Sequence, residues 1–274
     1  MAVTENNMKH IKKDGLEYFV FENLEKAGVK HCFSTRKGGV SEGCFSSLNL
    51  SFREDKPENV IENYRRICTA IGTNEKNTVW TRQIHTDNII EVGCDDRGKG
   101  LFAERQTDGY DGVYTKEKDV VLTGFSADCV LLFFYAPDVK AIAMTHSGWR
   151  GTVMEIGGKT ADILAQKYGA DKSKILAGIS PAIGKCCFQV DEPVAAEFKD
   201  KLKWSEQFIA VDESEEGKFF IDLHSINQKI LEKHGLRPEN IENSRICTKC
   251  HPDLFYSHRI MGNDRGSLAG LITL

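Results

Sequence analysis

The chain has 274 residues, of which 41% are hydrophobic and 28% are charged, and its formal net charge is -4. This composition excludes a disordered or fibrous protein, and it predicts one domain over residues 1–274 with a sizeable core. The near-balance of charges also argues against a nucleic-acid surface, which would be basic, but it leaves room for small anionic ligands at local clusters.

Nine cysteines, an odd number, are scattered along the chain. No apolar run approaches the roughly 20 residues that cross a membrane, and the first residues do not resemble a secretion signal. We therefore expect a cytoplasmic protein without a membrane partner, in which the thiols are reduced or bound to metal. The sequence does not fix the oligomeric state, and a monomer or weak homodimer is the expectation.

The chain opens with a polar segment, residues 1–15, that we expect to be poorly ordered. A helix is predicted over Pro57–Ile71, where the proline suits the first turn and apolar residues recur on one face. A short β-rich run follows at Thr78–Thr81. Three apolar runs, typical of strands buried on both faces, then occupy Val120–Phe125, Val130–Tyr135 and Val139–Thr145.

The second half of the chain predicts more helices. One covers Thr152–Tyr168 and ends at Gly169, and another runs from Asp222, a plausible N-cap, to Gly235. A weaker helical pattern covers Asp191–Lys201. Since strands fill much of the remainder without regular βαβ alternation, the fold class is α+β.

Two short segments carry polar side chains that the apolar strands do not explain. Cys129 ends the segment Ser126–Cys129, and His146 opens the segment His146–Gly151. Gln83–His85 adds a second imidazole at the end of another β-rich run. Two imidazoles and one thiolate, with a fourth position open, have the composition of a catalytic zinc site.

The same residues allow two other interpretations. Cys129 and His146 are also a suitable nucleophile and base for acyl transfer. In the third interpretation they are core residues, since cysteine is among the most often buried side chains. The polar neighbours Asp128, Ser147 and Arg150 favour a site over a core.

The loop before the predicted helix at Thr152 is a candidate anion site. Glycine-flanked backbone at a helix N-terminus offers free N–H groups, and Arg150 adds a bidentate donor. Arg36, in the loop Arg36–Gly39, supplies a second basic surface.

Cys247 and Cys250 have the C-x-x-C spacing that suits zinc or redox chemistry. A structural zinc needs a second pair of ligands, however, and the adjacent residues Cys186 and Cys187 lack the spacing of a chelating pair. We therefore expect reduced structural thiols here rather than a second metal site.

Eight motifs, in order, resemble those of the YfiH-like laccase-domain family, whose members are variously named polyphenol oxidases and purine nucleoside phosphorylases. The resemblance runs from about Phe33 to Leu274. Its motifs are Ser34–Ser41, Ser47–Leu50, Gln83–His85, Asp111–Thr115, Ala127–Cys129, His146–Gly151, Ser180–Gly184 and Cys247–Cys250.

The resemblance implies a layered α+β fold in which helices cover packed mixed sheets, related to Cys–His hydrolases of the cytotoxic-necrotizing-factor type. It places the metal ligands on His85, Cys129 and His146, which the chemistry of the residues also selects. It further implies substrate or phosphate contacts from Arg36, Arg150 and Asn49.

The chain departs from the family pattern at a few places. Leu131 stands where the family usually has proline, and Ser180 stands where it commonly has glycine. The tail resembles the family only loosely, with Ser257–Arg259 and Asn263–Gly266 in place of its arginine-rich motifs.

The first hypothesis is a zinc-dependent purine nucleoside phosphorylase that acts with phosphate on adenosine, inosine, guanosine or methylthioadenosine. The same zinc site is suited to deaminating adenosine. Asp128 is then a candidate carboxylate for moving protons, or one that orients His85 or His146.

The alternative is a Cys129–His146 amidase that edits cell-wall peptidoglycan precursors. A copper-dependent phenol oxidase is less expected, because the eight histidines include no His-x-His pair for a multinuclear copper cluster.

Overall fold

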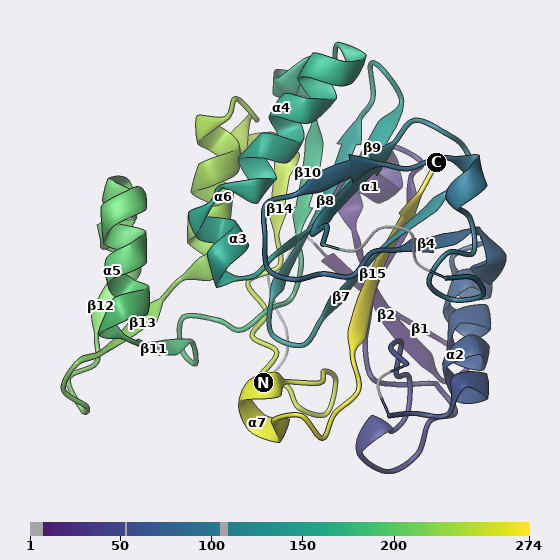
Figure 1. Cartoon of the computed structure of the whole chain (residues 1–274), viewed down its shortest axis with the longest axis horizontal. Coiled ribbons are helices and arrows are strands. Elements are labelled where there is room, and N and C mark those ends of the chain that lie inside the picture. The colour runs from purple at the N-terminus through teal and green to yellow at the C-terminus, as the bar shows by residue number, and fades with distance from the viewer. Residues whose placement is uncertain (1–7, 53, 105–108) are drawn as a thin grey trace.

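The computed structural model describes residues 8–52, 54–104 and 109–274. Two six-stranded mixed sheets form the centre of the molecule (Figure 1). The first contains, in spatial order, β1 (Met8–Lys13), β2 (Leu16–Phe21), β3 (Lys30–Ser34), β15 (Leu268–Thr273), β7 (Val121–Ser126) and β4 (Thr78–Trp80). The second contains β14 (Ile241–Asn243), β10 (Leu176–Ile179), β8 (Val130–Ala136), β9 (Ala141–Ser147), β6 (Gly112–Thr115) and β5 (Ile89–Glu91).

The larger helices α2, α4 and α6 cover the outer faces of these sheets. The bounds of the helices are α1 (Glu22–Lys26), α2 (Pro57–Ala70), α3 (Trp149–Val153), α4 (Ile156–Tyr168), α5 (Glu192–Lys201), α6 (Leu223–Lys233) and α7 (His258–Met261). In Figure 1, α2 lies beside the first sheet, and α4 and α6 lie on the opposite side, over the second. A small third sheet, β11 (Gln189–Asp191), β13 (Lys218–Ile221) and β12 (Ile209–Val211), extends to one side with α5.

The alternation of side chains along β8 explains why the two sheets stack. Leu131 and Phe133 are buried in the core between the sheets. Leu132 and Phe134 point the other way, into the core beneath α4 and α6. Because successive side chains of a strand point to opposite faces, a strand that is apolar at every position must be covered on both sides. The predicted pattern of buried strands is confirmed here.

Helix α2 covers the outer face of the first sheet for the reason that its sequence predicts. Val60, Tyr64 and Ile67 recur at helical spacing and are fully buried against that sheet. The predicted helices at 57–71, 191–201 and 222–235 are confirmed to within two residues at either end, and the Asp222 side chain caps α6 by accepting from the Ser225 N–H group.

Two expectations from the sequence are wrong. The helix predicted over Thr152–Tyr168 is two helices, α3 and α4, separated where Glu155 takes a left-handed conformation with φ of 56°. Within the segment 1–15, which we expected to be poorly ordered, Met8–Lys13 form β1 and pair along their full length with β2, while residues 1–7 lie outside the described part of the chain. Local composition missed this strand because its partner, β2, provides the burial.

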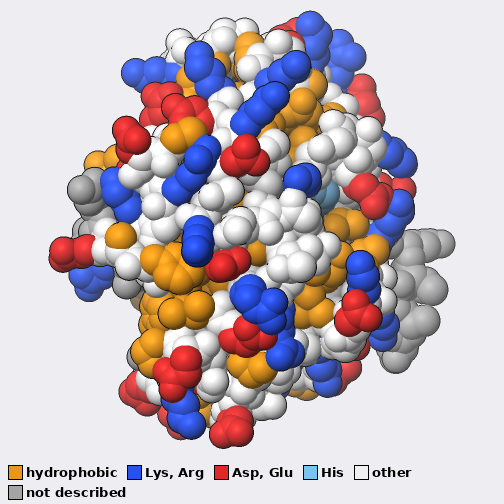
Figure 2. Space-filling model, turned by 90° about the vertical axis from the view of Figure 1, so that its right-hand side faces the viewer, with side chains coloured by type: hydrophobic (Ala, Val, Ile, Leu, Met, Phe, Trp, Pro, Cys, Tyr) orange, Lys and Arg blue, Asp and Glu red, His pale blue; other side chains and the backbone are white. Residues whose placement is uncertain are grey.

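The observed architecture is a mixed α+β fold with several mixed sheets and covering helices, as the sequence predicts. Its surface mixes charge types, as the near-balance of 36 basic and 40 acidic residues implies. On the face shown in Figure 2, Lys and Arg side chains alternate with acidic and hydrophobic ones. Across the described ranges, the helices are too short or too polar to span a membrane.

Candidate functional site

Cys129 lies where the chain crosses from one sheet to the other. β7 ends at Ser126 in the first sheet, and β8 begins at Val130 in the second. In the short link between them, Asp128 has a φ of 94°, a conformation that costs a non-glycine residue of order 1–3 kcal/mol. The fold therefore holds this link in a strained shape that sets the position of the Cys129 thiol.

His85 also lies in a strained turn, with a φ of 63°. Gln83 ties the start of this turn to β7, since its side chain exchanges two hydrogen bonds with the Phe125 backbone at 2.9 and 2.7 Å. The Asp111 carboxylate fixes the remainder of the turn. It accepts hydrogen bonds from the backbone N–H groups of Ile84, His85 and Thr86 at 2.8 to 3.1 Å.

The same carboxylate orients His146. Asp111 directly precedes β6, which pairs with β9, and so it lies beside His146. The His146 Nδ1 atom is 2.8 Å from Asp111 Oδ1, and both side chains are almost completely buried. In the neutral ring this contact assigns the Nδ1 proton to the bond with Asp111, so that Nε2 has the lone pair that a metal requires, the arrangement commonly found behind metal-binding histidines.

The electrostatics of this group are strongly coupled. Burial would lower the pKa of His146, but the Cys129 sulfur and the Asp111 carboxylate outweigh it and raise the pKa to about 9. Burial also lowers the pKa of His85, and the neighbouring His146 adds to this effect. Asp111 keeps its charge despite burial, because its bonds to His146 and to the backbone lower its pKa.

His85, Cys129 and His146 offer three donor atoms that all lie within 4.8 Å of one another. The two imidazole rings meet edge to face, with centroids 4.8 Å apart. Gly148 makes room for them, since a Cβ atom there would come within 2.8 Å of His85 Nδ1 and 3.3 Å of Cys129 Sγ. Two imidazoles and one thiolate, converging on one point and supported by a buried carboxylate, fit a divalent metal of the zinc or copper type.

The three donors lie in the wall of a cavity of about 720 Å³, a size that suits a small-molecule ligand. Among the described residues, five aromatic side chains line it: Phe52, Trp80, Phe125, Trp149 and Phe188. Of the described arginines, Arg82, Arg259 and Arg265 also line it. The cavity thus combines flat apolar surfaces with guanidinium groups and candidate metal ligands.

The predicted substrate contacts Arg36, Asn49 and Arg150 are not among the described residues that line this cavity. The Arg36 guanidinium donates instead to the carbonyl groups of Ser46 and Pro252. Asn49 is fully buried, and it bonds the backbone of Ser51 and of Ser267, both of which do line the cavity. Arg36 and Asn49 therefore hold loops in place.

The anion site expected at the start of the Thr152 helix is also not supported. Helix α3 begins earlier, at Trp149, and is only five residues long, so its dipole is small. The Thr152 N–H group is already bonded to the Gly148 carbonyl at 2.8 Å. The Arg150 guanidinium lies over the Trp149 ring, 4.2 Å from its centroid.

Asp128 lines the cavity, but it does not orient either histidine. Its carboxylate accepts hydrogen bonds from Thr248 Oγ1 at 2.6 Å, Ser257 Oγ at 3.0 Å and the Arg259 backbone N–H group at 2.8 Å. The orienting role that the sequence left open for Asp128 belongs to Asp111. Through these hydrogen bonds Asp128 instead connects the segment between β7 and β8, which carries Cys129, to the C-terminal residues Ser257 and Arg259.

The sequence contained signals for the residues that were missed. Asp111 opens one of the eight quoted motifs, but nothing in its spacing showed that β6 would lie next to β9. Arg259 and Arg265 belong to the tail segments that depart from the family pattern, and both line the cavity. Arg82, two residues before Ile84, is the third basic residue of the cavity wall.

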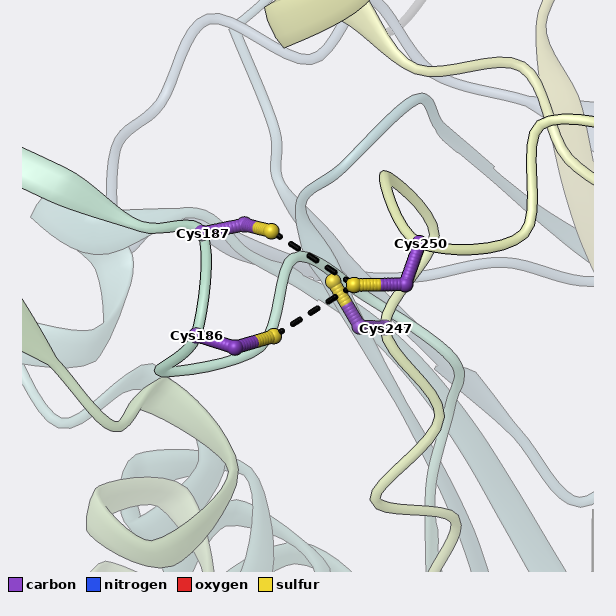
Figure 3. Close-up of side chains that lie close together, drawn as sticks. All are labelled: Cys186, Cys187, Cys247 and Cys250. Carbon is purple, nitrogen blue, oxygen red and sulfur yellow. Dashed lines mark hydrogen bonds between the residues drawn. The ribbon is translucent and has the colours of Figure 1, made fainter. Parts of the chain in front are cut away.

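The structure corrects the argument from spacing for the remaining cysteines, while their expected reduced state stays a prediction. Cys186, Cys187, Cys247 and Cys250 form a second group whose sulfur atoms all lie within 4.8 Å of one another (Figure 3). The argument from spacing failed because the chain turns at residues 185–187, which brings both adjacent side chains toward Cys250.

Comparison with known proteins identifies the family. Residues 30–274 match the family described as multi-copper polyphenol oxidoreductase laccase. The chain is 37% identical to the purine nucleoside phosphorylase YlmD of Bacillus subtilis, over 83% of this chain and 82% of that protein. It is 32% identical to the purine nucleoside phosphorylase LACC1 of Mus musculus over 89% of this chain, and it spans 55% of the length of LACC1.

Solved structures show the same fold. The crystal structure of the Bacillus licheniformis hypothetical protein YfiH superposes with a TM-score of 0.92 and 30% identity, over 98% of this chain and 100% of that one. The structure of YlmD from Geobacillus stearothermophilus gives a TM-score of 0.87 and 30% identity, over 98% of this chain and 99% of that one. The resemblance seen in the motifs is thereby confirmed, and the chain belongs to the multi-copper polyphenol oxidoreductase laccase family, alongside proteins of the YfiH and YlmD type.

Proposed function

We propose that this chain is a purine nucleoside phosphorylase with one catalytic domain, in which His85, Cys129 and His146 bind one zinc ion. The observation that carries the proposal is the convergence of these three donors in the wall of a cavity that also presents arginines and aromatic rings. Relatives named purine nucleoside phosphorylase, at up to 37% identity, support the reaction type.

The reaction joins phosphate to the sugar of a nucleoside. A phosphate oxygen forms a bond to the anomeric carbon of ribose, and the bond from that carbon to the purine nitrogen breaks. Its electron pair leaves with the base, which takes up a proton from the dihydrogen form of phosphate, so that ribose 1-phosphate and free base are the products. A bound zinc ion would supply positive charge near the reacting groups.

The chain's own residues place the reactants. Arg82 and Arg259 are our candidates for binding phosphate, because guanidinium groups match its geometry and both line the cavity. Arg259 is held there by its Nη1 atom, which donates to the Gln189 carbonyl at 2.7 Å. Aromatic rings such as Phe125 and Trp149 offer flat surfaces for a purine. Holding both reactants in one cavity lowers the entropic part of the barrier.

Deamination of adenosine would need a carboxylate that moves a proton at the purine ring. Asp128 is the one acidic residue among the described residues of the cavity wall. Because both of its oxygens accept hydrogen bonds from the protein, we assign it a positioning role. Phosphorolysis is therefore the reaction that we place first.

One observation favours a second candidate. Asp111, His146 and Cys129 lie in a row, in which Asp111 orients the histidine and the Cys129 sulfur lies within 4.8 Å of a ring nitrogen of His146. This is the order of a carboxylate, a base and a nucleophile in a cysteine hydrolase. An amidase acting on cell-wall precursors thus stays an alternative prediction, as does the relation to toxin-type Cys–His hydrolases.

Metal analysis combined with product chromatography tests the proposal. Wild type, Cys129→Ala and the control Cys44→Ser, which alters an exposed cysteine outside the site, are incubated with phosphate and adenosine or inosine. We expect free base and ribose 1-phosphate from wild type and control only, with zinc lost at the site in Cys129→Ala. Inosine formed from adenosine would report deamination.

Alkylation separates the two candidates. A zinc-bound thiolate is a poor nucleophile, so iodoacetamide should modify Cys129 slowly in the zinc-loaded protein and faster after chelation. Rapid modification of Cys129 in protein as purified, with no metal at the site and no nucleoside turnover, would contradict the phosphorylase proposal and favour the amidase.

A further inference from the structure

Four cysteines from two distant segments meet at the surface beside the tail of the chain (Figure 3). Cys186 and Cys187 come from the turn before β11, and Cys247 and Cys250 come from the segment after β14. The Sγ atoms of Cys186 and Cys187 each lie 3.6 Å from the Sγ atom of Cys250. A disulfide would require about 2.05 Å, so these are contacts between separate thiols.

The spacing of the sulfurs matches tetrahedral coordination. Zinc–sulfur bonds of about 2.3 Å place neighbouring sulfurs of a tetrahedron about 3.8 Å apart. The two 3.6 Å contacts are close to that value, and all four sulfurs lie within 4.8 Å of one another.

The backbone around Cys247 is arranged to stabilise a thiolate. The Gly184 N–H group donates to Cys247 Sγ at 3.2 Å, and such a bond favours the thiolate form. Gly184 permits the approach, because a Cβ atom there would lie 3.1 Å from Cys247 Cβ and 3.4 Å from Cys186 Sγ.

The two segments are held in register independently of the thiols. Ala182 and Cys247 form a parallel bridge, with hydrogen bonds from the Ala182 N–H group to the Ile246 carbonyl at 3.1 Å and from the Thr248 N–H group to the Ala182 carbonyl at 3.0 Å. The four ligand positions are therefore preorganised by main-chain contacts, as a metal site requires. Lys185 and Lys249 directly precede Cys186 and Cys250, and their charges would offset the net double negative charge of a zinc ion with four thiolates.

We propose that Cys186, Cys187, Cys247 and Cys250 bind a second zinc ion, which is structural and distinct from the ion at His85, Cys129 and His146. Four protein thiolates fill a tetrahedral shell, so this ion has no open position for substrate. Binding displaces the thiol protons to solvent and forms four zinc–sulfur bonds without any change in oxidation state.

The site would also support the cavity. Thr248, between the two cysteines of the C-x-x-C turn, donates from Oγ1 to the Asp128 carboxylate at 2.6 Å. Asp128 in turn binds Ser257 and the backbone of Arg259. A metal that fixes the turn at 247–250 would thus fix the link that carries Cys129 and the tail segment that carries Arg259.

Zinc stoichiometry of the full chain tests the proposal. We expect two zinc ions per chain in wild type, one in the double variant Cys186→Ser/Cys250→Ser and one in Cys129→Ala. The matched control Cys44→Ser/Cys94→Ser also replaces two exposed cysteines and should keep both ions. A single ion that Cys129→Ala removes and Cys186→Ser/Cys250→Ser retains would overturn the second site while leaving the proposed function intact.

Cobalt substitution of wild type gives a measurement that needs no variant to fold. Co²⁺ bound by four thiolates absorbs by charge transfer much more strongly than Co²⁺ bound by one thiolate and two imidazoles. We expect the spectrum of the two-cobalt protein to show the four-thiolate component. A spectrum with only the one-thiolate component, or a disulfide between any two of the four cysteines in protein purified without air, would contradict the proposal.

Discussion

We propose different roles for the two cysteine-containing groups of this protein. At the first, His85, Cys129 and His146 supply three donors, and a cavity of about 720 Å³ opens beside them. At the second, four thiols converge, and two of them, Cys186 and Cys250, are exposed at the surface. Three ligands with an open position suit catalysis, whereas four ligands close the coordination shell and suit structure. The number of ligands, rather than the presence of cysteine, separates the roles.

The two groups also differ in how they are supported. Asp111, a buried carboxylate, orients His146 and the backbone of the His85 turn. The cysteine group has a backbone N–H donor from Gly184 instead. Imidazoles need a partner that fixes the tautomer, while thiolates need only donors that stabilise negative charge. The polar groups around each site therefore follow from its ligand types.

Metal removal should have the largest effect on activity. The two sites should release their zinc ions one after the other. Treatment of the zinc-loaded protein with a chelator should release the ion at His85, Cys129 and His146 first, because its open position is accessible from the cavity. We expect phosphorolysis to fall by more than about 100-fold with release of the first ion and to recover when zinc is restored. Zinc release and activity are measured on the same samples. Loss of activity that follows the second ion instead would reverse the assignment of roles.

Substitution of the orienting carboxylate should affect one site only. In Asp111→Asn, the amide keeps the size of the side chain but loses the charge that holds His146 and the turn at His85. We expect zinc affinity at the three-ligand site to fall by roughly 10- to 100-fold, as is typical for such partners, with the four-thiolate site unchanged. Competition with a zinc-binding dye measures both affinities.

Asp95→Asn is the matched control for this change, because Asp95 is exposed and lies outside both groups. Equal losses at the two sites in Asp111→Asn would indicate general unfolding and would break the distinction between them.

Removal of the hydrogen bond between Thr248 and Asp128, which connects the two sites, should give the smallest effect. Thr248→Val removes the hydroxyl that donates to Asp128 and leaves a buried carboxylate oxygen with one bond fewer. We expect the free energy of unfolding to fall by about 1–3 kcal/mol, and KM for phosphate to rise because Arg259 is held less firmly. Denaturant unfolding and steady-state kinetics measure the two quantities.

Thr273→Val controls for the loss of a hydroxyl, since Thr273 is also buried and its Oγ1 atom has no hydrogen-bond partner in the described part of the chain. It should leave stability unchanged or slightly higher. If Thr248→Val behaved like this control in both measurements, the two sites would be independent.

Much of the fold was predictable because local patterns carry it. The apolar runs at β7 and β8 and the spaced apolar residues of α2 are confirmed, since burial on two faces or one face imposes those patterns. The break at Glu155 was missed because a single left-handed residue leaves no mark on helical periodicity. β1 was missed because a short polar edge strand gains its stability from the strand beside it.

The sequence by itself identified His85, Cys129 and His146 as candidate ligands, because their residue types and polar neighbours are uncommon among buried strands. Tertiary structure decided what surrounds them. Strand order placed Asp111 beside His146, a turn brought Cys186 and Cys187 to Cys250, and the tail delivered Arg259 to the cavity. Those contacts join residues tens to more than a hundred positions apart, so they depend on the order in which strands pair and on how loops pack, which local spacing along the chain does not encode.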